Sequence, residues 1–238
     1  MFGKKLMKGS IELKLNENQF CTVWEGRAEE CSHDFSIDTN ADQYNLFYRN
    51  GQFMGTPTPF GGSIYPFSVD PLQKGSRHQK KQFNRAKIVC ISNSFNLKVY
   101  WGTKIPFMLL DRETQKPYSV GASGVFYIEI ESSDGARNAD RFYRKLLTQG
   151  DPAQMTTEAL RDKLAETFIN RVGAKIQEYL ETLNRPLSNL VGLQPSEFLK
   201  ISEELYPNLK DIFDDYGLTI ANGSRGSILQ RLVVNSVE

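Results

Sequence analysis

Hydrophobic and polar positions alternate most clearly in the middle of the chain, between residues 97 and 130. Phe126, Ile128 and Ile130 fall on one side of an extended backbone, whereas Tyr127 and Glu129 fall on the other. A strand with one fully apolar face must bury that face against another layer. The long helical patterns begin only after this region, so we expect helices to form that layer.

Shorter runs predict the other strands. In residues 44–54, Asn50-Gly51 supplies the two positive φ values of a type I′ turn, which predicts a hairpin. We also expect residues 88–92 and 97–101 to pair as a hairpin across a turn at 93–96. The polar residues 25–43 predict a loop. The remaining predicted strand pieces are 11–15, 19–24, 107–110, 118–130, 218–220 and 228–234.

Helical spacing of apolar residues governs most of the last hundred residues. Thr156 or Thr157 is expected to cap the longest helix, and Ser196 to cap the last one. Pro207 should kink or split that last helix, and Gly217 should end it. The predicted helices are 138–147, 157–183, a weaker 187–191, and 197–216.

These elements predict an α+β fold, in which a curved, mainly antiparallel β-sheet is followed by a helical half packed on one face. We expect a lead segment at 1–18 and a single domain at 19–238. That domain would be β-rich over 19–131, helix-rich over 138–216, and completed by a final strand at 218–237.

Composition reduces the number of possible classes of function. The net charge of +1 gives no support to nucleic-acid binding. No apolar run approaches the roughly 20 residues of a membrane-spanning helix, and the N-terminus lacks the apolar core of a secretory signal. The three cysteines are too few for a disulfide scaffold and favour a reducing cytoplasm.

Two basic segments are candidate contact sites. A short N-terminal helix would place lysines around an apolar patch and bind anionic lipid, the alternative being a frayed terminus. Its residues are Phe2, Lys4, Lys5, Leu6, Met7 and Lys8. A basic loop would meet phosphate head groups, nucleic acid or an acidic neighbouring subunit, the alternative being a solvated loop that protects a sheet edge. Its residues are Lys74, Arg77, Lys80, Lys81, Arg85 and Lys87.

The chain carries no recognisable catalytic constellation. His33 and His78 lie in polar segments outside any nucleophile motif. Cys21, Cys31 and His33 are too widely spaced for a zinc site and lack a fourth ligand. The carboxylates at the strand ends, and the glycines at 61–62 and 121–124, match no acid–base pair or phosphate loop. Those carboxylates are Asp111, Glu113, Glu129 and Glu131. We therefore expect no enzymatic activity and no cofactor.

Several motifs taken in order resemble the SPFH or band 7 superfamily of stomatins, prohibitins and flotillins, and its bacterial virion-core-protein-like subgroup in particular. They cover residues 19–237, although the polar stretch before the hairpin is longer than in that family and no long coiled coil follows. The motifs are Gln19-Phe20 with Val23-Trp24, the 47–53 hairpin, Phe60-Gly61-Gly62-Ser63 with Pro66-Phe67, Tyr100-Trp101-Gly102-Thr103 with Pro106-Phe107 and Asp111, Gly124, and Tyr216-Gly217-Leu218.

The resemblance implies a scaffold that forms homo-oligomers on the cytoplasmic face of a membrane and gathers membrane-protein partners there. It transfers no catalytic residue. The alternative is a soluble protein-binding module that uses the basic loop at 74–87 without touching a membrane. We interpret Trp101-Gly102-Thr103 as a determinant of the fold and not as a binding site, so that loss of the Trp101 side chain would cost stability if it is buried.

Overall fold

The computed structural model describes residues 10–15, 19–27, 36–39, 42–57, 59–60, 63–64, 85–93, 96–149, 155–183 and 186–237. The chain forms two compact units, which we describe separately. Unit 1 comprises Met1–Phe95 and Ile130–Thr157, and unit 2 comprises Asn96–Glu129 and Glu158–Glu238. Antiparallel sheets with helices confirm the predicted α+β class. The prediction of one domain over 19–238 stays a prediction.

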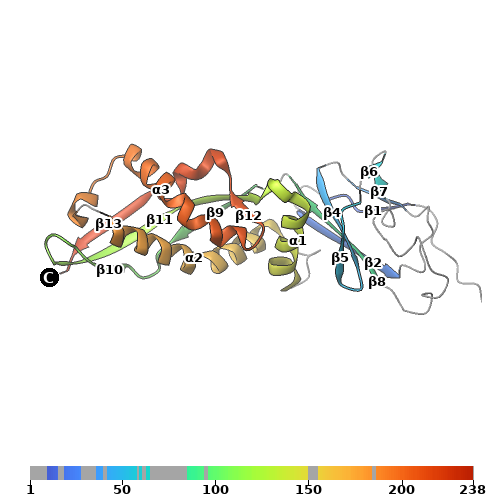
Figure 1. Ribbon diagram of the computed structural model, residues 1–238, viewed down its shortest axis with the longest axis horizontal. Helices are drawn as coiled ribbons and strands as arrows, with labels where there is room; N and C mark the ends of the chain where they lie inside the picture. Colours follow the sequence, from blue (N-terminus) through green and yellow to red (C-terminus); the bar gives the residue numbers. More distant parts are fainter. Residues whose placement is uncertain are drawn as a thin grey trace, which may run out of the picture. The chain divides into compact units, whose positions relative to one another are not determined.

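Unit 1 is built on an antiparallel sheet of order β2-β8-β4-β5 (Figure 1). The predicted hairpin is confirmed, because Asn50 and Gly51 take φ values of 49° and 80° between β4 and β5. The strands of this sheet are β2 (Cys21–Arg27), β4 (Gln43–Arg49), β5 (Gln52–Gly55) and β8 (Arg85–Ser92).

The predicted hairpin between residues 88–92 and 97–101 is wrong. β8 pairs with β2 and β4 inside unit 1, whereas β9 (Asn96–Gly102) pairs with β11 (Pro117–Ile130) in unit 2. Two strands that are separated by a few residues need not pair with each other, because the chain can also pass from one sheet to another between them. The boundary between the units falls between Phe95 and Asn96.

A small second sheet corrects the predicted loop at 25–43. β2 continues to Arg27, and Ser36–Asp38 forms β3, which pairs in parallel with β1. Ile37 is fully buried, so a polar stretch with one suitable apolar residue still contributes to the core. The order of this sheet is β1 (Ser10–Glu12), β3, β7 (Ser63–Ile64), β6 (Pro59–Phe60).

Helix α1 (Gly135–Leu146), predicted at 138–147, belongs to unit 1. Phe142 and Leu146 are buried, and the hydroxyl of Tyr48 on β4 donates a 2.5 Å hydrogen bond to Asp140. Short 3₁₀ helices lie on either side of α1. They are η4 (Ser132–Asp134) and η5 (Leu147–Gln149).

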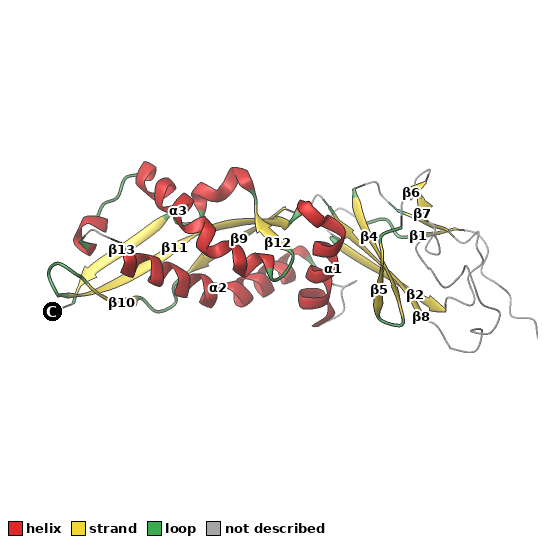
Figure 2. Ribbon diagram, in the orientation of Figure 1, coloured by secondary structure: helices red, strands yellow, loops and turns green. Residues whose placement is uncertain are grey.

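In unit 2, the long strand β11 lies at the centre of a five-stranded sheet (Figure 2). β9 and β10 pair with successive parts of β11, and β13 pairs with residues 118–123. The short strands β10, β12 and β13 were all predicted, although β13 begins later than expected. Their bounds are β10 (Phe107–Leu110), β12 (Leu218–Ile220) and β13 (Arg231–Ser236), with η7 (Asn222–Ser227) before β13.

Helices α2 (Thr157–Thr182) and α3 (Pro195–Asp214) cover one face of this sheet (Figure 1). The ring of Phe126 on β11 lies 5.5 Å from that of Phe213 on α3, which in turn lies 4.8 Å from Phe168 on α2. The apolar stripe predicted for α2 is therefore its buried face. A 3₁₀ helix, η6 (Leu187–Leu190), joins the two.

The ends of α3 differ from the prediction. Gln194, not Ser196, forms a capping box with Glu197, because the helix begins two residues earlier than predicted, at Pro195. Pro207 does not split α3, which continues to Asp214. Gly217 follows with a φ of 71°, as expected of a glycine just after a helix.

Candidate interaction surfaces

The predicted lipid-binding segment lies outside the described residues. This applies to Phe2, Lys4, Lys5, Leu6, Met7 and Lys8. Lys74, Arg77, Lys80 and Lys81 of the basic loop, together with Cys31, His33 and His78, lie outside them as well.

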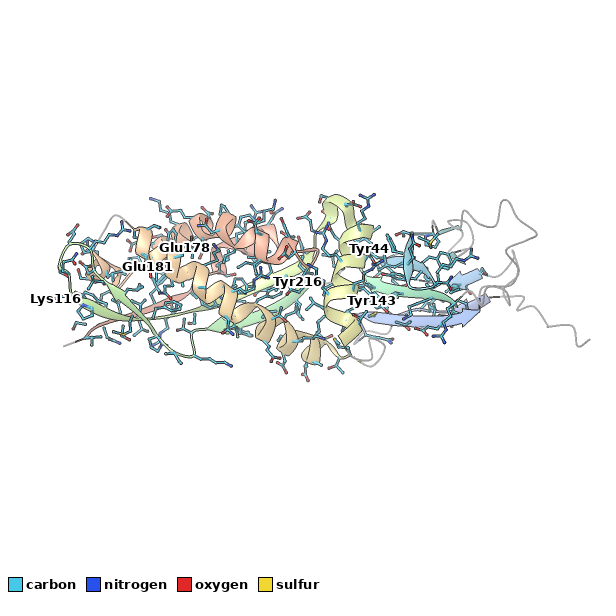
Figure 3. All side chains as sticks on the ribbon, turned by 60° about the horizontal axis from the view of Figure 1, so that its bottom comes forward. Tyr44, Lys116, Tyr143, Glu178, Glu181 and Tyr216 are labelled. Atoms are coloured by element: carbon cyan, nitrogen blue, oxygen red, sulfur yellow. The ribbon has the colours of Figure 1, made fainter. Side chains whose placement is uncertain are left out.

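The last two residues of the predicted basic loop belong to strand β8, so the prediction of a loop there is wrong. The ammonium group of Lys87 lies 2.5 Å from the carboxylate of Glu25 on β2. It also donates a 3.4 Å hydrogen bond to the hydroxyl of Tyr143, which lies on α1 (Figure 3). The backbone amide of Arg85 donates to the side chain of Asn50. Lys87 thus has partners within unit 1, while the side chain of Arg85 is exposed.

The sheet of unit 2 presents an apolar strip on the face opposite its helices. Met108 and Leu110 on β10 are 58% and 59% exposed, and Val233 on β13 is 39% exposed. Strand register places all three on one face: Met108 is opposite Ser119 on β11, and Val233 is opposite Gly121. We call Met108, Leu110 and Val233 the outer strip. The β11 residues opposite Met108 and Val233, Ser119 and Gly121, have small side chains.

The outer strip extends to two edges of that sheet. Within the described part of the chain, β10 and β13 each pair with β11 alone. A strand paired on one side carries backbone groups able to pair with another strand. Sequence patterning missed this surface, because the run Phe-Met-Leu-Leu at 107–110 does not reveal which alternate residues face the helices.

Trp101 belongs to the core of unit 2, which agrees with its interpretation as a determinant of the fold. Its side chain is 4% exposed, and its indole N–H donates a 2.7 Å hydrogen bond to the carbonyl of Ile228. Its ring stacks on that of Phe126 at 5.8 Å. Within the Tyr-Trp-Gly-Thr motif, Trp101 therefore has a role in packing the core.

The buried carboxylate of Asp111 organises the β10–β11 turn, whose Lys116 is labelled in Figure 3. It accepts hydrogen bonds from the backbone amides of Thr114, Glu113 and Leu187, and from the Thr114 hydroxyl. These bonds, that of the Thr114 amide above all, hold the pKa of Asp111 below its usual value. A carboxylate with this set of partners is a structural anion and a poor proton donor.

The two described cysteines are buried, free thiols in the sheet of unit 1. Burial raises the pKa of Cys90 to about 12, and it raises the pKa of Cys21 as well. Both stay protonated at neutral pH, which disfavours a nucleophile or a metal ligand. Among the described residues no group of three histidine, cysteine or acidic side chains is placed to hold a metal.

Comparison of the chain with protein-family models, curated proteins and solved structures finds no match. Within the ranges that the structure describes, no helix combines the length and apolar character needed to cross a bilayer.

Proposed function

We propose that this protein is a non-enzymatic scaffold that self-associates and organises partner proteins at the cytoplasmic face of a membrane. The observation that carries the proposal is the outer strip, which places apolar side chains beside two edge strands of one sheet. Isolated exposed apolar residues are common on protein surfaces. Three on one face, at edges that retain pairing capacity, favour a protein contact.

The partner that we propose for these edge strands is a second copy of the same chain. If β10 of one copy paired with β13 of the next, Met108 and Leu110 would continue into Val233 of the neighbour. Such head-to-tail contacts generate rings or open filaments. The motifs that resemble the SPFH superfamily support the same proposal, and the basic N-terminal segment supports a membrane surface as its place.

Light scattering of the intact chain tests self-association. We expect a mass that rises with concentration above the 27.1 kDa of one chain. Replacing Met108 and Leu110 by glutamate should return the mass to one chain, because it places charge at the contact. Leu199→Glu is the matched control: Leu199 is a half-exposed apolar residue of α3, on the helical side of unit 2. A strict monomer at high concentration, or a double variant that assembles like the wild type, would contradict self-association.

Flotation with vesicles that contain anionic lipid tests the membrane contact. The intact chain should float with the vesicles, and replacement of Lys4, Lys5 and Lys8 by glutamine should reduce flotation, more so at low salt. An intact chain that ignores these vesicles would favour the alternative, a protein-binding module that uses the basic loop. Lys87 contributes little to that alternative, since it is paired with Glu25.

A further inference from the structure

Unit 2 contains an open pocket of about 930 Å³, bounded by 3₁₀ helix η7, helix α3 and the start of β9. It lies outside the outer strip and outside both predicted basic segments. Its lining mixes aromatic, amide, hydroxyl and charged groups. The lining residues include Asn96, Tyr127, Leu199, Glu203, Asn222 and Arg225.

Arg225 is the cationic group of this pocket, and its guanidinium is held in place. The group lies 3.7 Å from the centre of the Tyr206 ring and donates a 2.9 Å hydrogen bond to the Tyr206 hydroxyl. That hydroxyl also lies 3.5 Å from the hydroxyl of Thr219. Contact with an aromatic face leaves the edge of a guanidinium available for an in-plane partner.

The charge of Arg225 has no anionic partner among the described residues. No described carboxylate lies within the 4.0 Å ion-pair distance of it, and its buried Nε has no described acceptor. A buried donor of this kind is normally satisfied. A guanidinium that is held in place in the wall of a pocket, and whose charge no described carboxylate balances, points to an anion supplied by a ligand.

The other lining residues restrict the class of that anion. Glu203 contributes one negative charge to the same pocket, which disfavours a multiply charged phosphate. The side-chain oxygens of Glu203, Asn96 and Asn222 can accept hydrogen bonds from a ligand N–H. Tyr127 and Leu199 add apolar surface.

We propose that this pocket binds a carboxylate flanked by an amide N–H and an apolar group. Arg225 would hold the carboxylate, and the oxygen acceptors of the lining would receive the N–H. This chemistry occurs at the C-terminal end of a peptide chain and in small N-acylated amino acids. The site does not depend on self-association, and its test works in any oligomeric state.

Amide chemical shifts of the intact chain, titrated with N-acetyl-L-leucine, test the site. We expect saturable shifts that are concentrated at residues 222–227 and at Tyr127. N-acetyl-L-leucinamide, which differs by the missing charge, should bind at least tenfold more weakly. Absence of saturable shifts with the acid, equal binding of the amide, or equal binding of inorganic phosphate would each overturn the proposal.

Arg225→Gln should weaken binding of the acid at least tenfold, whereas Arg112→Gln removes an exposed charge from the β10–β11 turn and should leave binding unchanged. Gly223→Leu keeps Arg225 and provides a second variant in case Arg225→Gln does not fold. A Cβ at Gly223 would meet nothing within 4 Å, so the new side chain can occupy the pocket. Binding retained in a folded Arg225→Gln or Gly223→Leu variant would overturn the assignment.

A hexapeptide ending in leucine with a free carboxylate identifies the source of the ligand. Binding at least tenfold tighter than that of N-acetyl-L-leucine would support a peptide terminus. Equal or weaker binding would support a small acid in the same site.

Discussion

The two units hold their helices against their sheets by different contacts. In unit 1, a polar network adds to the buried apolar residues of α1 and to the contact between the rings of Tyr48 and Tyr143. Tyr48 donates to Asp140, Asp140 accepts a 2.8 Å bond from Arg144, and the Arg144 guanidinium lies 5.6 Å from the Tyr48 ring. Lys87 adds its contacts with Glu25 and Tyr143.

In unit 2 the corresponding contacts are aromatic. Trp101 stacks on Phe126, Phe126 contacts Phe213, and Phe168 contacts both Phe213 and Tyr216. Aromatic pairs change little with pH, whereas hydrogen-bonded ionisable groups respond to it directly. The comparison predicts that substitutions in the aromatic core cost most, and that unit 1 weakens in alkali.

The two tryptophans allow each unit to be followed separately. Trp24 lies on β2 and packs against the core of unit 1, while Trp101 lies on β9 in unit 2. Trp101→Phe therefore leaves a fluorescent reporter of unit 1, and Trp24→Phe leaves one of unit 2.

The largest loss should follow Trp101→Ala. Truncation leaves a cavity beside Phe126 and removes the donor to Ile228, which should cost about 3–5 kcal/mol of unfolding free energy. Trp101→Phe keeps most of the ring volume and should cost less. Urea unfolding followed by circular dichroism measures both. An unchanged transition for Trp101→Ala would mean that the aromatic cluster does not stabilise unit 2.

Gly124→Ala comes next, because β11 passes very close to the segment after η7. A Cβ at Gly124 would lie 2.0 Å from the Ile228 carbonyl oxygen and 2.9 Å from the Trp101 indole nitrogen. Overpacking of this kind costs roughly 1–3 kcal/mol. Gly121→Ala on the same strand is the control, since its nearest neighbour is 3.7 Å away. Equal unfolding free energies for the two variants would contradict this close approach.

Most elements could be predicted from sequence because their signals are local. The Asn50-Gly51 hairpin, the stripe of α2 and the stop at Gly217 each depend on neighbouring residues. The partners of β8 and β9 could not, because pairing depends on residues far apart in sequence, and a turn between two strands is compatible with either outcome.

The candidate sites also differ in whether local sequence could predict them. Burial of Trp101 followed from its type and setting. The outer strip depends on which side of β10 the helices cover, and the pocket at Arg225 arises where η7, α3 and β9 meet in space. Lys87 was predicted on a basic loop because charge runs do not indicate where a strand begins.

Asp111→Asn should make the stability of unit 2 less sensitive to a fall in pH. The pKa of Asp111 is lowered by folding, so its contribution is complete above the unfolded pKa of about 3.9 and is lost as pH falls through the folded value. The variant should melt below the wild type at pH 7, and the difference should narrow towards pH 3. Trp101 fluorescence in a Trp24→Phe background records this. A constant difference from pH 7 to pH 3 would contradict a role for the charge.

The smallest effect at neutral pH should follow Tyr48→Phe, about 1 kcal/mol for one lost hydrogen bond, because Asp140 keeps Arg144 as a partner. Burial, aided by the bond to Asp140, raises the pKa of Tyr48. Its contribution is therefore complete below the unfolded pKa of about 10 and is lost as pH rises above it. Wild-type unit 1 should weaken steeply in alkali, and Tyr48→Phe less steeply.

Urea unfolding between pH 7 and pH 11, followed by Trp24 fluorescence in a Trp101→Phe background, measures this slope. Cys21, Cys90 and Tyr143, whose pKa values burial also raises, should leave a residual alkaline slope in the variant. Tyr100→Phe, which removes an exposed tyrosine of unit 2, is the control. Parallel slopes for wild type and Tyr48→Phe would show that the hydroxyl of Tyr48 is not the source of alkaline sensitivity, and would assign it to the remaining buried groups of unit 1.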